Sequence, residues 1–453
     1  MSSEGVLDAT ARRFEQIVAE AQSAGRMPSL AAGVVRGGEL VWSGVRGRVE
    51  GGVPSVDTQY RIGSLTKSFV ALLVMRLRDE GLVDLSDPVE RHVPGSVIGD
   101  RTVAQLLSHT GGVVAELPGP WWERSAGVGR DELHERLAAG AVVSRAGRGF
   151  HYSNPGYAVL GELVERVRGK AWSEILTAEV LGPLGMSRTT PLPEGEHARG
   201  WAVHPWADVV LPEVVQDTVA MGPAGQLWST VGDLGRWAAF LGGDTGEVLS
   251  SGTLEEMCEP VGVADGDVWT SGYGLGLQVW REGGRRRVGH GGSMPGFVSG
   301  IVVDRERCSG AVALLNCTMS PKAGVAGLLL SALDELEPPV PGEWSPESGV
   351  DVSLLEVTGP WYWGASPSAV RLLRDGWLEL SVLGGRGRGS RFRPNGDGTW
   401  TGLDGYYAGE VLRVVRGEDG VVRHLDLGTF VYTREPYGPA GSVPGGVDEG
   451  GWR

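Results

Sequence analysis

The first residues that could do chemistry are a serine and a lysine three positions apart, in Ser64-Leu65-Thr66-Lys67. Residues at this spacing share one face of a helix, so the Ser64 hydroxyl and the Lys67 amine can touch. A serine hydroxyl is a weak nucleophile and needs an adjacent base. A lysine supplies that base when burial lowers the pKa of its amine enough to leave it neutral. The pair alone is equally compatible with a capped helix that carries a surface lysine.

A tyrosine and an asparagine form the second candidate, in Tyr152-Ser153-Asn154-Pro155. In an extended or turn segment this spacing places the phenol and the amide on the same side. The phenol could relay a proton between a nucleophile and a leaving group. The amide could hold a substrate carbonyl or the lysine. The alternative interpretation is a turn closed by Asn154-Pro155.

The third candidate is a glycine-rich segment after a strand, His290-Gly291-Gly292-Ser293. Glycines allow a substrate backbone to approach a strand closely, and a strand N–H group there could complete an oxyanion hole. The histidine could bind a carboxylate or tune the tyrosine. The alternative is a glycine-rich turn with an incidental histidine.

Taken in this order, the three motifs resemble the serine β-lactamases and penicillin-binding peptidases, especially the class C-like branch. Two further segments are similar to recurring segments of that branch: Leu106-Leu107-Ser108-His109-Thr110-Gly111-Gly112 and Pro223-Ala224-Gly225-Gln226-Leu227-Trp228-Ser229-Thr230. The resemblance covers about residues 10 to 335. No serine lies in the G-x-S-x-G pattern of a nucleophile elbow, and we expect Ser108-His109 to have a structural role.

The resemblance implies a role for each matching residue. Ser64 would attack a carbonyl and become acylated, while Lys67 and Tyr152 share the base and acid work. Asn154 would orient the substrate or Lys67. The backbone N–H groups of Ser64 and Ser293 would form the oxyanion hole.

His290 departs from the class C pattern, because it takes the place of a lysine found in true class C β-lactamases. This argues against β-lactam hydrolysis, since the cation that faces the drug carboxylate is missing. In this family a histidine there is common among esterases, D-amino-acid peptidases and peptide cyclases.

The elements that must position these residues follow from hydrophobic periodicity. Helices are expected at 7–24, 64–78, 102–108, 157–167, 233–241 and 325–336, and Asp87-Pro88 is expected to open another. Strands are expected at 30–35, 40–45, 273–280, 286–289, 298–303 and 310–316. This order indicates an α+β domain over residues 1–336, with one antiparallel sheet built from both ends of the domain, flanked by helices, and an inserted all-helical region.

A proline-rich linker is expected at 337–352, beginning with Glu337-Pro338-Pro339-Val340-Pro341. Beyond it, short strands are expected at 369–374, 377–383, 411–415, 421–425 and 430–433. They predict a small antiparallel barrel over 353–437. The glycine- and proline-rich segment 438–453 is expected to be a flexible tail.

Composition excludes several classes of partner. The 453 residues carry a formal net charge of −15, so a nucleic acid partner is not expected. Arg285-Arg286-Arg287 lies between glycines and is expected to be a hairpin tip with solvated charge. Three cysteines, Cys258, Cys308 and Cys317, indicate buried thiols rather than a metal site or a disulfide framework. We expect no metal and no cofactor.

The N-terminal residues show no signal-peptide pattern, and no apolar run is long enough to span a bilayer. We therefore expect a cytoplasmic protein with an internal substrate and no membrane partner. The C-terminal barrel resembles the lipocalin-like module of stand-alone penicillin-binding-protein-type thioesterases of non-ribosomal peptide pathways. Such enzymes take a peptide from a carrier thioester onto serine, and the peptide's own amine releases it as a macrocycle.

Under this hypothesis the substrate is a peptidyl thioester, delivered by a carrier protein and released from Ser64 by head-to-tail macrocyclisation. Arg434 could project from the barrel toward the site and bind a polar group of the substrate. The alternative for Arg434 is a surface ion pair on the barrel rim. Two other functions stay open: a D-amino-acid-specific peptidase or esterase that uses water as acceptor, and a catalytically silent binding or sensor protein.

Overall fold

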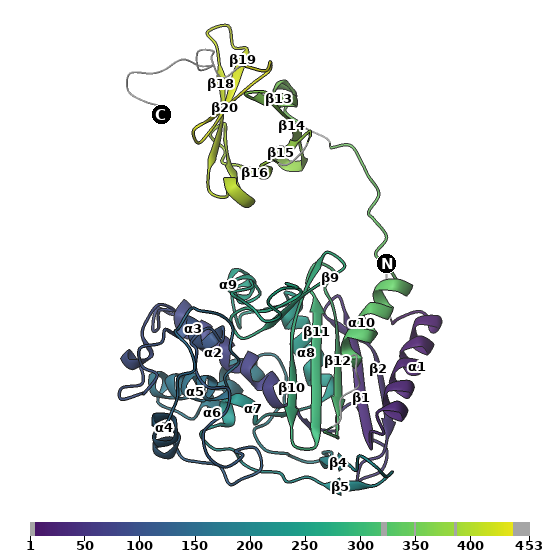
Figure 1. Ribbon diagram of the computed structural model, residues 1–453. Coiled ribbons are helices and arrows are strands. Elements are labelled where there is room, and N and C mark those ends of the chain that lie inside the picture. The colour runs from purple at the N-terminus through teal and green to yellow at the C-terminus, as the bar shows by residue number, and fades with distance from the viewer. Residues whose placement is uncertain (1–4, 319–323, 348–349, 385–386, 438–453) are drawn as a thin grey trace. The chain divides into compact units, whose positions relative to one another are not determined.

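Strand β1 (Ser29–Arg36) is buried on both faces, because its apolar residues run without a break from Leu30 to Val35. Leu30, Ala32 and Val34 contribute to a core shared with helices α1 (Asp8–Ala24) and α10 (Val325–Leu336). Ala31 and Val35 contribute to a larger core that includes most of helix α2 (Thr66–Asp79). The strand therefore separates two apolar layers (Figure 1).

The structure is a computed structural model that describes residues 5–318, 324–347, 350–384 and 387–437. Its contacts divide the chain into an N-terminal unit that ends at Val340 and a C-terminal unit that begins at Pro341. The predicted tail at 438–453 lies outside the described residues. No helix or strand occurs in the described residues between Glu337 and Asp351. No described helix is both long and apolar enough to cross a membrane.

The N-terminal unit is built on an eight-stranded antiparallel sheet, in the order β2-β1-β12-β11-β10-β9-β8-β7. The other strands are β2 (Glu39–Gly47), β7 (Gly262–Val263), β8 (Ser271–Tyr273), β9 (Gln278–Glu282), β10 (Arg285–Met294), β11 (Phe297–Asp304) and β12 (Ser309–Leu315). Because β1 pairs with β12, the sheet is assembled from both ends of the unit, as predicted. The single strand predicted at 273–280 is wrong: β8 and β9 form a hairpin there, and the turn between them needs Gly276 at φ +87°.

Most helices between β2 and β7 form the inserted region beside the sheet, whereas α8 (Val231–Gly242) packs on the sheet against β1 and β12 (Figure 1). The inserted helices and the short elements among them are β3 (Tyr60–Arg61), η1 (Gly63–Leu65), η2 (Val89–Arg91), α3 (Val103–Leu107), α4 (Arg130–Ala138), α5 (Asn154–Arg168), α6 (Trp172–Leu176), η3 (Thr177–Leu181), β4 (Trp201–Val203), β5 (Val210–Pro212), α7 (Gly222–Gly225), β6 (Trp228–Ser229) and α9 (Ser251–Met257). The helix predicted at Asp87-Pro88 is wrong, because only the turn η2 forms. The Val89 N–H donates to the Arg101 carbonyl instead of continuing a helix.

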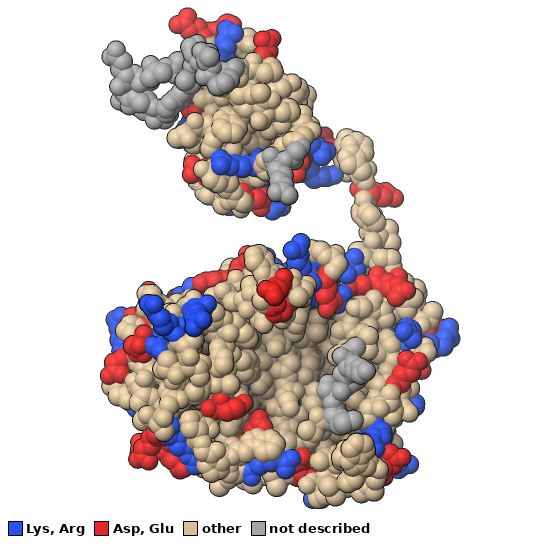
Figure 2. Space-filling model, viewed as in Figure 1, with Lys and Arg blue, Asp and Glu red and all other residues tan. Residues whose placement is uncertain are grey.

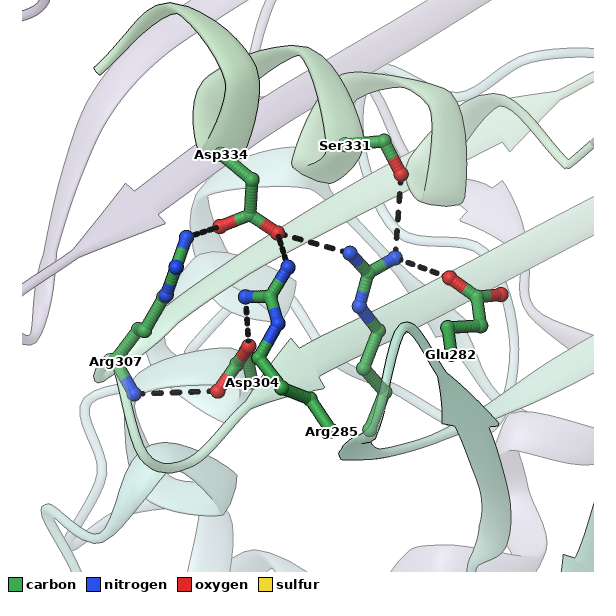
Figure 3. A network of polar contacts seen from close by, with 7 residues as sticks. Glu282, Arg285, Asp304, Arg307, Ser331 and Asp334 are labelled. Atoms are coloured by element: carbon green, nitrogen blue, oxygen red, sulfur yellow. Dashed lines mark hydrogen bonds and ion pairs between the residues drawn. The ribbon is translucent and has the colours of Figure 1, made fainter. Parts of the chain in front are cut away.

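An ion-pair network attaches α10 to the sheet (Figure 3). Asp334 of α10 accepts hydrogen bonds from Arg285 (2.7 Å), Arg287 (2.9 Å) and Arg307 (2.5 Å). Arg285 also donates to the fully buried Asp304. The expectation that Arg285-Arg286-Arg287 is a solvated hairpin tip is therefore wrong, since Arg285 begins β10 and Arg287 is 3% exposed.

The three cysteines divide by exposure. Cys258 and Cys317 are buried, as expected, but Cys308 is exposed. The difference has a local cause, because Cys308 lies in the tight turn between β11 and β12, where its φ is +46°. Such a turn leaves little core for its side chain to enter.

The C-terminal unit is a closed antiparallel barrel in which each strand pairs with the next along the chain. Its strands are β13 (Gly359–Trp363), β14 (Ser366–Leu372), β15 (Leu378–Val382), β16 (Ser390–Pro394), β17 (Thr399–Gly402), β18 (Val411–Arg416), β19 (Val422–Leu427) and β20 (Phe430–Thr433), with the short helices η4 (Val352–Val357), η5 (Arg374–Gly376) and η6 (Gly405–Tyr407). Pairing of Tyr362 with Thr433 closes the ring. The barrel has its own aromatic and aliphatic core, which includes Trp361, Phe392 and Tyr407.

Asp334→Ala is expected to lower the free energy of unfolding by about 3–5 kcal/mol, because it leaves the buried Arg287 guanidinium undercompensated. Burial alone would raise the pKa of Asp334, but hydrogen bonds from Arg285 and Arg307 hold it below its ordinary value. The stabilisation is therefore present at neutral pH and lost as the pH falls below about 4. Urea unfolding followed by circular dichroism at 222 nm measures both effects.

The matched control for this prediction is Glu50→Ala. Glu50 pairs with Arg199 at 3.1 Å, and the side chains are 65% and 46% exposed. Its removal is expected to change the free energy of unfolding by less than about 1 kcal/mol. An equal loss for both variants would contradict the importance given to the Asp334 network.

Candidate active site

Ser64 lies in the short helix η1, directly before α2, where the chain passes close to the sheet. Gly63 has φ +52°, and a Cβ atom placed on it would lie 2.6 Å from the backbone nitrogen of Ser293. Only glycine combines this backbone conformation with such a close approach. The tertiary fold therefore places the backbones of Ser64 and Ser293 next to each other, although 229 positions separate them in the sequence.

The part of β10 that faces Ser64 is an open edge of the sheet. Pairing of β10 with β9 ends at Gly289 and Gln278, so among the described strands the segment from His290 to Met294 pairs only with β11. A Cβ atom on Gly292 would lie 1.9 Å from the Ile62 carbonyl oxygen. Gly292 thus makes room for the protein's own backbone, whereas the sequence suggested that it admits a substrate.

The Lys67 amine lies at the centre of the site and is fully buried. Its Nζ atom is 3.0 Å from Ser64 Oγ, 2.7 Å from Asn154 Oδ1 and 2.6 Å from the Ala224 carbonyl oxygen. Two of these partners can only accept hydrogen bonds, but the Ser64 hydroxyl can also donate. A neutral amine would therefore give its two protons to Asn154 and Ala224 and direct its lone pair at the Ser64 hydroxyl.

Burial lowers the pKa of Lys67 to about 7. The cause is desolvation of the ammonium ion, which outweighs the opposing attraction of the carboxylates of Glu116 and Glu123. Near neutral pH a large fraction of the Lys67 amine is thus unprotonated. The geometry and the pKa together make Lys67 able to accept the Ser64 proton.

Tyr152 lies beside the same two residues. Its ring centroid is 4.8 Å from Lys67 Nζ, and the nearby Ser64 hydroxyl lowers the pKa of its phenol, against the larger effect of burial. Burial raises the pKa of Tyr152, so its phenol is neutral at physiological pH. The placement follows from the start of α5, where the Ser153 hydroxyl accepts from the Gly156 N–H and caps the helix.

His290 is buried behind Tyr152, and both its ring nitrogens have protein partners. Nδ1 lies within hydrogen-bond distance of the Gly291 carbonyl, which can only accept, so Nδ1 carries the proton. Nε2 then accepts from the Tyr273 hydroxyl at 2.8 Å. Burial lowers the pKa of His290 to about 3, and Lys67 contributes to the shift. A neutral ring with both nitrogens engaged does not supply the cation that a carboxylate would need.

Sequence reasoning missed several residues that complete the site. Asn154 Nδ2 donates to Glu116 Oε1 at 2.9 Å, and this bond sets the orientation in which Asn154 receives Lys67. Glu116 is exposed, and the Trp122 indole holds its other oxygen. Glu116 and Glu123 lie in the loop between α3 and α4, where neither hydrophobic periodicity nor a sequence motif indicated that they belong to the site.

His109 was expected to be structural, and it lies directly under the site. Its ring centroid is 4.2 Å from that of Tyr152, and its Nδ1 accepts the Ser153 N–H. Burial holds the pKa of His109 well below its ordinary value. The neutral His109 ring thus packs against the Tyr152 ring and helps to hold it in position.

Arg434 uses its guanidinium within its own barrel. It donates to the backbone carbonyls of Glu356, Thr358 and Pro360, and it stacks at 3.9 Å over the Trp361 ring. These contacts attach the segment after η4 to the end of the barrel, a role that differs from the surface ion pair considered as the alternative. Binding of substrate by Arg434 stays a prediction.

The arrangement is suited to nucleophilic chemistry with a serine and a lysine base. Within the described residues, no group of three or more His, Cys, Asp and Glu side chains is placed to hold a metal ion. The surface over the middle of β10 and β11 is uncharged, and charged residues surround it (Figure 2).

Comparison with known families gives two matches. A family model described as beta-lactamase matches residues 14–333. A model described as a domain of unknown function, DUF7586, matches residues 350–434, which span the barrel. Penicillin-binding protein 4 of Amycolatopsis lactamdurans is 29% identical over 297 residues, which are 60% of this chain and 76% of that protein. Beta-lactamase-like protein 2 of Dictyostelium discoideum is 27% identical over 278 residues, so that 56% of this chain matches half of that protein's length.

Solved structures share the fold. A D-stereospecific amidohydrolase from Streptomyces sp. has 26% identity and a TM-score of 0.62, over 73% of this chain and 99% of that one. SurE with D-Leu has 24% identity and a TM-score of 0.59, over 94% of this chain and 99% of that one. At its lower identity, the likeness to SurE is evidence for the fold alone.

Acylation of Ser64 is expected to rise with pH to a plateau, with a midpoint near the Lys67 pKa of about 7, because the unprotonated amine is the base. Labelling rates with a fluorophosphonate between pH 5 and 9 measure this profile. Glu116→Gln removes a carboxylate that raises the Lys67 pKa, so the midpoint should move to lower pH. Glu123→Gln, whose attraction is weaker, should move it less. A midpoint that is unchanged in Glu116→Gln would contradict this account.

Proposed function

The chain belongs to the beta-lactamase family, and from that premise we propose that it is a serine hydrolase or acyltransferase that works through an acyl-enzyme on Ser64. The observation that carries the proposal is the buried Lys67 amine, 3.0 Å from Ser64 Oγ and held between two acceptors. A silent binding protein would have no need for a buried lysine with a lowered pKa. This makes a binding or sensor function the weaker alternative.

In the proposed reaction, Lys67 takes the Ser64 proton as the hydroxyl oxygen attacks a carbonyl carbon. The oxyanion that forms accepts hydrogen bonds from the backbone N–H groups of Ser64 and Ser293. The neutral Tyr152 phenol and the protonated Lys67 then deliver a proton to the leaving group, and the acyl group stays on Ser64. In the second half the same groups take a proton from the acceptor, which is an amine or water, and Ser64 leaves with its own proton restored.

The charges around the site favour a substrate that carries an amine. Glu116 is exposed beside Lys67, and Glu123 is half-buried in the same loop. A substrate ammonium group would gain from both carboxylates, whereas a substrate carboxylate would meet two like charges and the neutral His290. These features support aminoacyl or peptidyl substrates over β-lactams.

The most specific form of the proposal is a trans-acting thioesterase for a non-ribosomal peptide. Ser64 would take the peptide from a carrier thioester, and the peptide's own amine would release it as a head-to-tail macrocycle. The acidic loop supports this form, because it can hold the amine of an acyl chain that folds back. The second candidate is a D-amino-acid peptidase or esterase with water as acceptor, which the likeness to a D-stereospecific amidohydrolase favours.

Incubation with a short peptidyl thioester that ends in a D-residue is expected to give an acyl adduct on Ser64, detected as intact protein mass. Ser64→Ala should abolish the adduct and lower turnover by about 10⁴-fold or more. Ser68→Ala is the matched control, because Ser68 is a buried serine one helical turn away whose hydroxyl donates to the Leu65 carbonyl. This variant should keep the adduct.

The product mass separates the two candidates. A cyclic product, one water lighter than the free acid, supports the macrocyclase, and a linear acid alone supports the hydrolase. Absence of an adduct with thioesters and simple esters, in a protein whose circular dichroism is native, would overturn the acyl-enzyme proposal.

Charge preference provides an independent prediction. Esters with a free amine on the acyl chain should be turned over several-fold faster than their N-succinylated analogues, and the ratio should fall as salt screens the carboxylates. Glu116→Gln combined with Glu123→Gln should bring the ratio of kcat/KM values toward one. Glu90→Gln, an exposed carboxylate of η2, is the control and should leave it unchanged. A ratio that does not depend on salt or on these residues would contradict the role of the acidic loop.

A further inference from the structure

A small cavity lies on the sheet face opposite the large core, next to the open edge of β10. It is a half-open space of about 180 Å³, bordered by strands β9 to β12 and the first turn of α10. The lining includes Gln278, Val298 and Val302 and no aspartate, glutamate, lysine or arginine among the described residues. The cavity is therefore an uncharged, mostly apolar space.

Four glycines that line the cavity leave this space empty. Gly291 of β10 and Gly300 of β11 pair directly across the sheet, and Gly324 and Gly327 lie at the start of α10. Among the described residues, a Cβ atom on Gly300, Gly324 or Gly327 would meet nothing within 4 Å, and one on Gly291 would meet only Gln278 Oε1 at 3.7 Å. Gly324 is exposed and the other three are half-buried, so the space opens to solvent, and glycines beside it allow a ligand to approach the backbone closely. We call it the glycine-lined cavity.

The cavity is reached from the same strand that faces Ser64. Side chains alternate along β10: Val288 and Met294 belong to the large core, whereas Arg287 binds Asp334 of α10. Gly291 therefore faces α10, together with Arg287. In the described part of the chain, the edge of β10 from His290 onward has no partner strand on the β9 side. The Gly291 N–H there donates to Gln278 Oε1 at 2.9 Å.

An extended peptide that continued the line of β9 along this edge would replace the Gln278 and His290 side chains, which engage the Gly291 N–H and carbonyl. Its side chains would alternate between the two faces of the sheet, so a residue opposite Gly291 would direct its side chain toward α10. An apolar cavity of about 150 Å³ holds a benzene ring, and this one is slightly larger. Its size and lining match a branched aliphatic side chain or a single phenyl ring.

We propose that the glycine-lined cavity is a specificity pocket that binds one apolar side chain of a peptidyl substrate, at the residue paired opposite Gly291. The proposal rests on the proposed function, because it places the peptide on the edge next to Ser64. The pocket adds a requirement on the substrate, which must carry an apolar residue next to the bond that reacts.

Two series of peptidyl thioesters test this pocket with the full chain. One series varies the residue whose carbonyl is attacked, and the other varies a residue in the thiol leaving group, each with leucine or alanine. In one of the two series the leucine substrate should have a kcat/KM about 10-fold or more above that of the alanine substrate. The series that shows this preference identifies the side of the reacting bond on which the pocket binds. Gly327→Leu and Gly300→Val, which fill the cavity from opposite walls, should bring that ratio toward one.

Gly252→Leu is the control, because Gly252 lies in helix α9 with only the Ser250 hydroxyl at 4.0 Å from its added Cβ. It should keep the leucine preference. Absence of a leucine preference in both series, or a preference that survives both cavity-filling variants, would overturn the proposal.

A binding measurement separates this inference from the catalytic proposal. In Ser64→Ala protein, N-acetyl-D-leucinamide and N-acetyl-L-leucinamide are titrated against the alanine amides by NMR. At least one leucine amide should bind more tightly than its alanine counterpart, and the difference should disappear in Ser64→Ala/Gly327→Leu. If this holds while no thioester acylates Ser64, the pocket stands and the acyl-enzyme proposal fails. If Ser64 is acylated but neither leucine amide is preferred, the pocket is overturned and the acyl-enzyme proposal stands.

Discussion

Burial of one lysine amine is the constraint on which the rest of the site depends. An isolated ammonium ion is costly to remove from water, and Lys67 is fully buried with its pKa lowered to about 7. The protein tolerates this because Asn154 and the Ala224 carbonyl accept its protons. Three separate elements, α2, α5 and α7, must therefore meet at one point. The burial that makes Lys67 a base also directs it at Ser64.

A second constraint is the close approach of two backbones. Gly63 and Gly292 allow β10 and the segment before Ser64 to pass within contact distance, and the Ser299 hydroxyl donates to the Ile62 carbonyl at 2.7 Å. The same strand is held from its other face through Arg287 and Asp334. The position of the predicted oxyanion donors thus depends on both cores and on the α10 network together.

The distribution of charge in the site follows from which ionisable groups are buried and which are exposed. His290 and His109 are buried and neutral, so neither adds a positive charge beside Lys67. Glu116 is exposed and remains available to a ligand even though Asn154 and Trp122 hold it in place. The site therefore offers negative charge at one side and an uncharged sheet face at the other. This combination fits an aminoacyl or peptidyl group better than a small anionic drug.

Arg434 shows what a local motif leaves open. Arg434 stands at the end of β20, where a projecting cation was expected, but its donors are used by the carbonyls of Glu356, Thr358 and Pro360. Those carbonyls lie more than 70 positions earlier in the chain, so strand sequence alone could not indicate them. Closure of the barrel brings them to Arg434.

The amino-acid sequence by itself determined the family, the α+β fold with a C-terminal barrel, and the assembly of the sheet from both ends. Periodicity and short motifs are local, and they identified Ser64, Lys67, Tyr152 and Asn154, which the structure brings together. Only the tertiary structure decided the partners of His290 and the place of Glu116, which depend on packing between distant segments. It also decided that β9 stops short and leaves β10 an open edge, because no local pattern records where one strand ceases to pair with another.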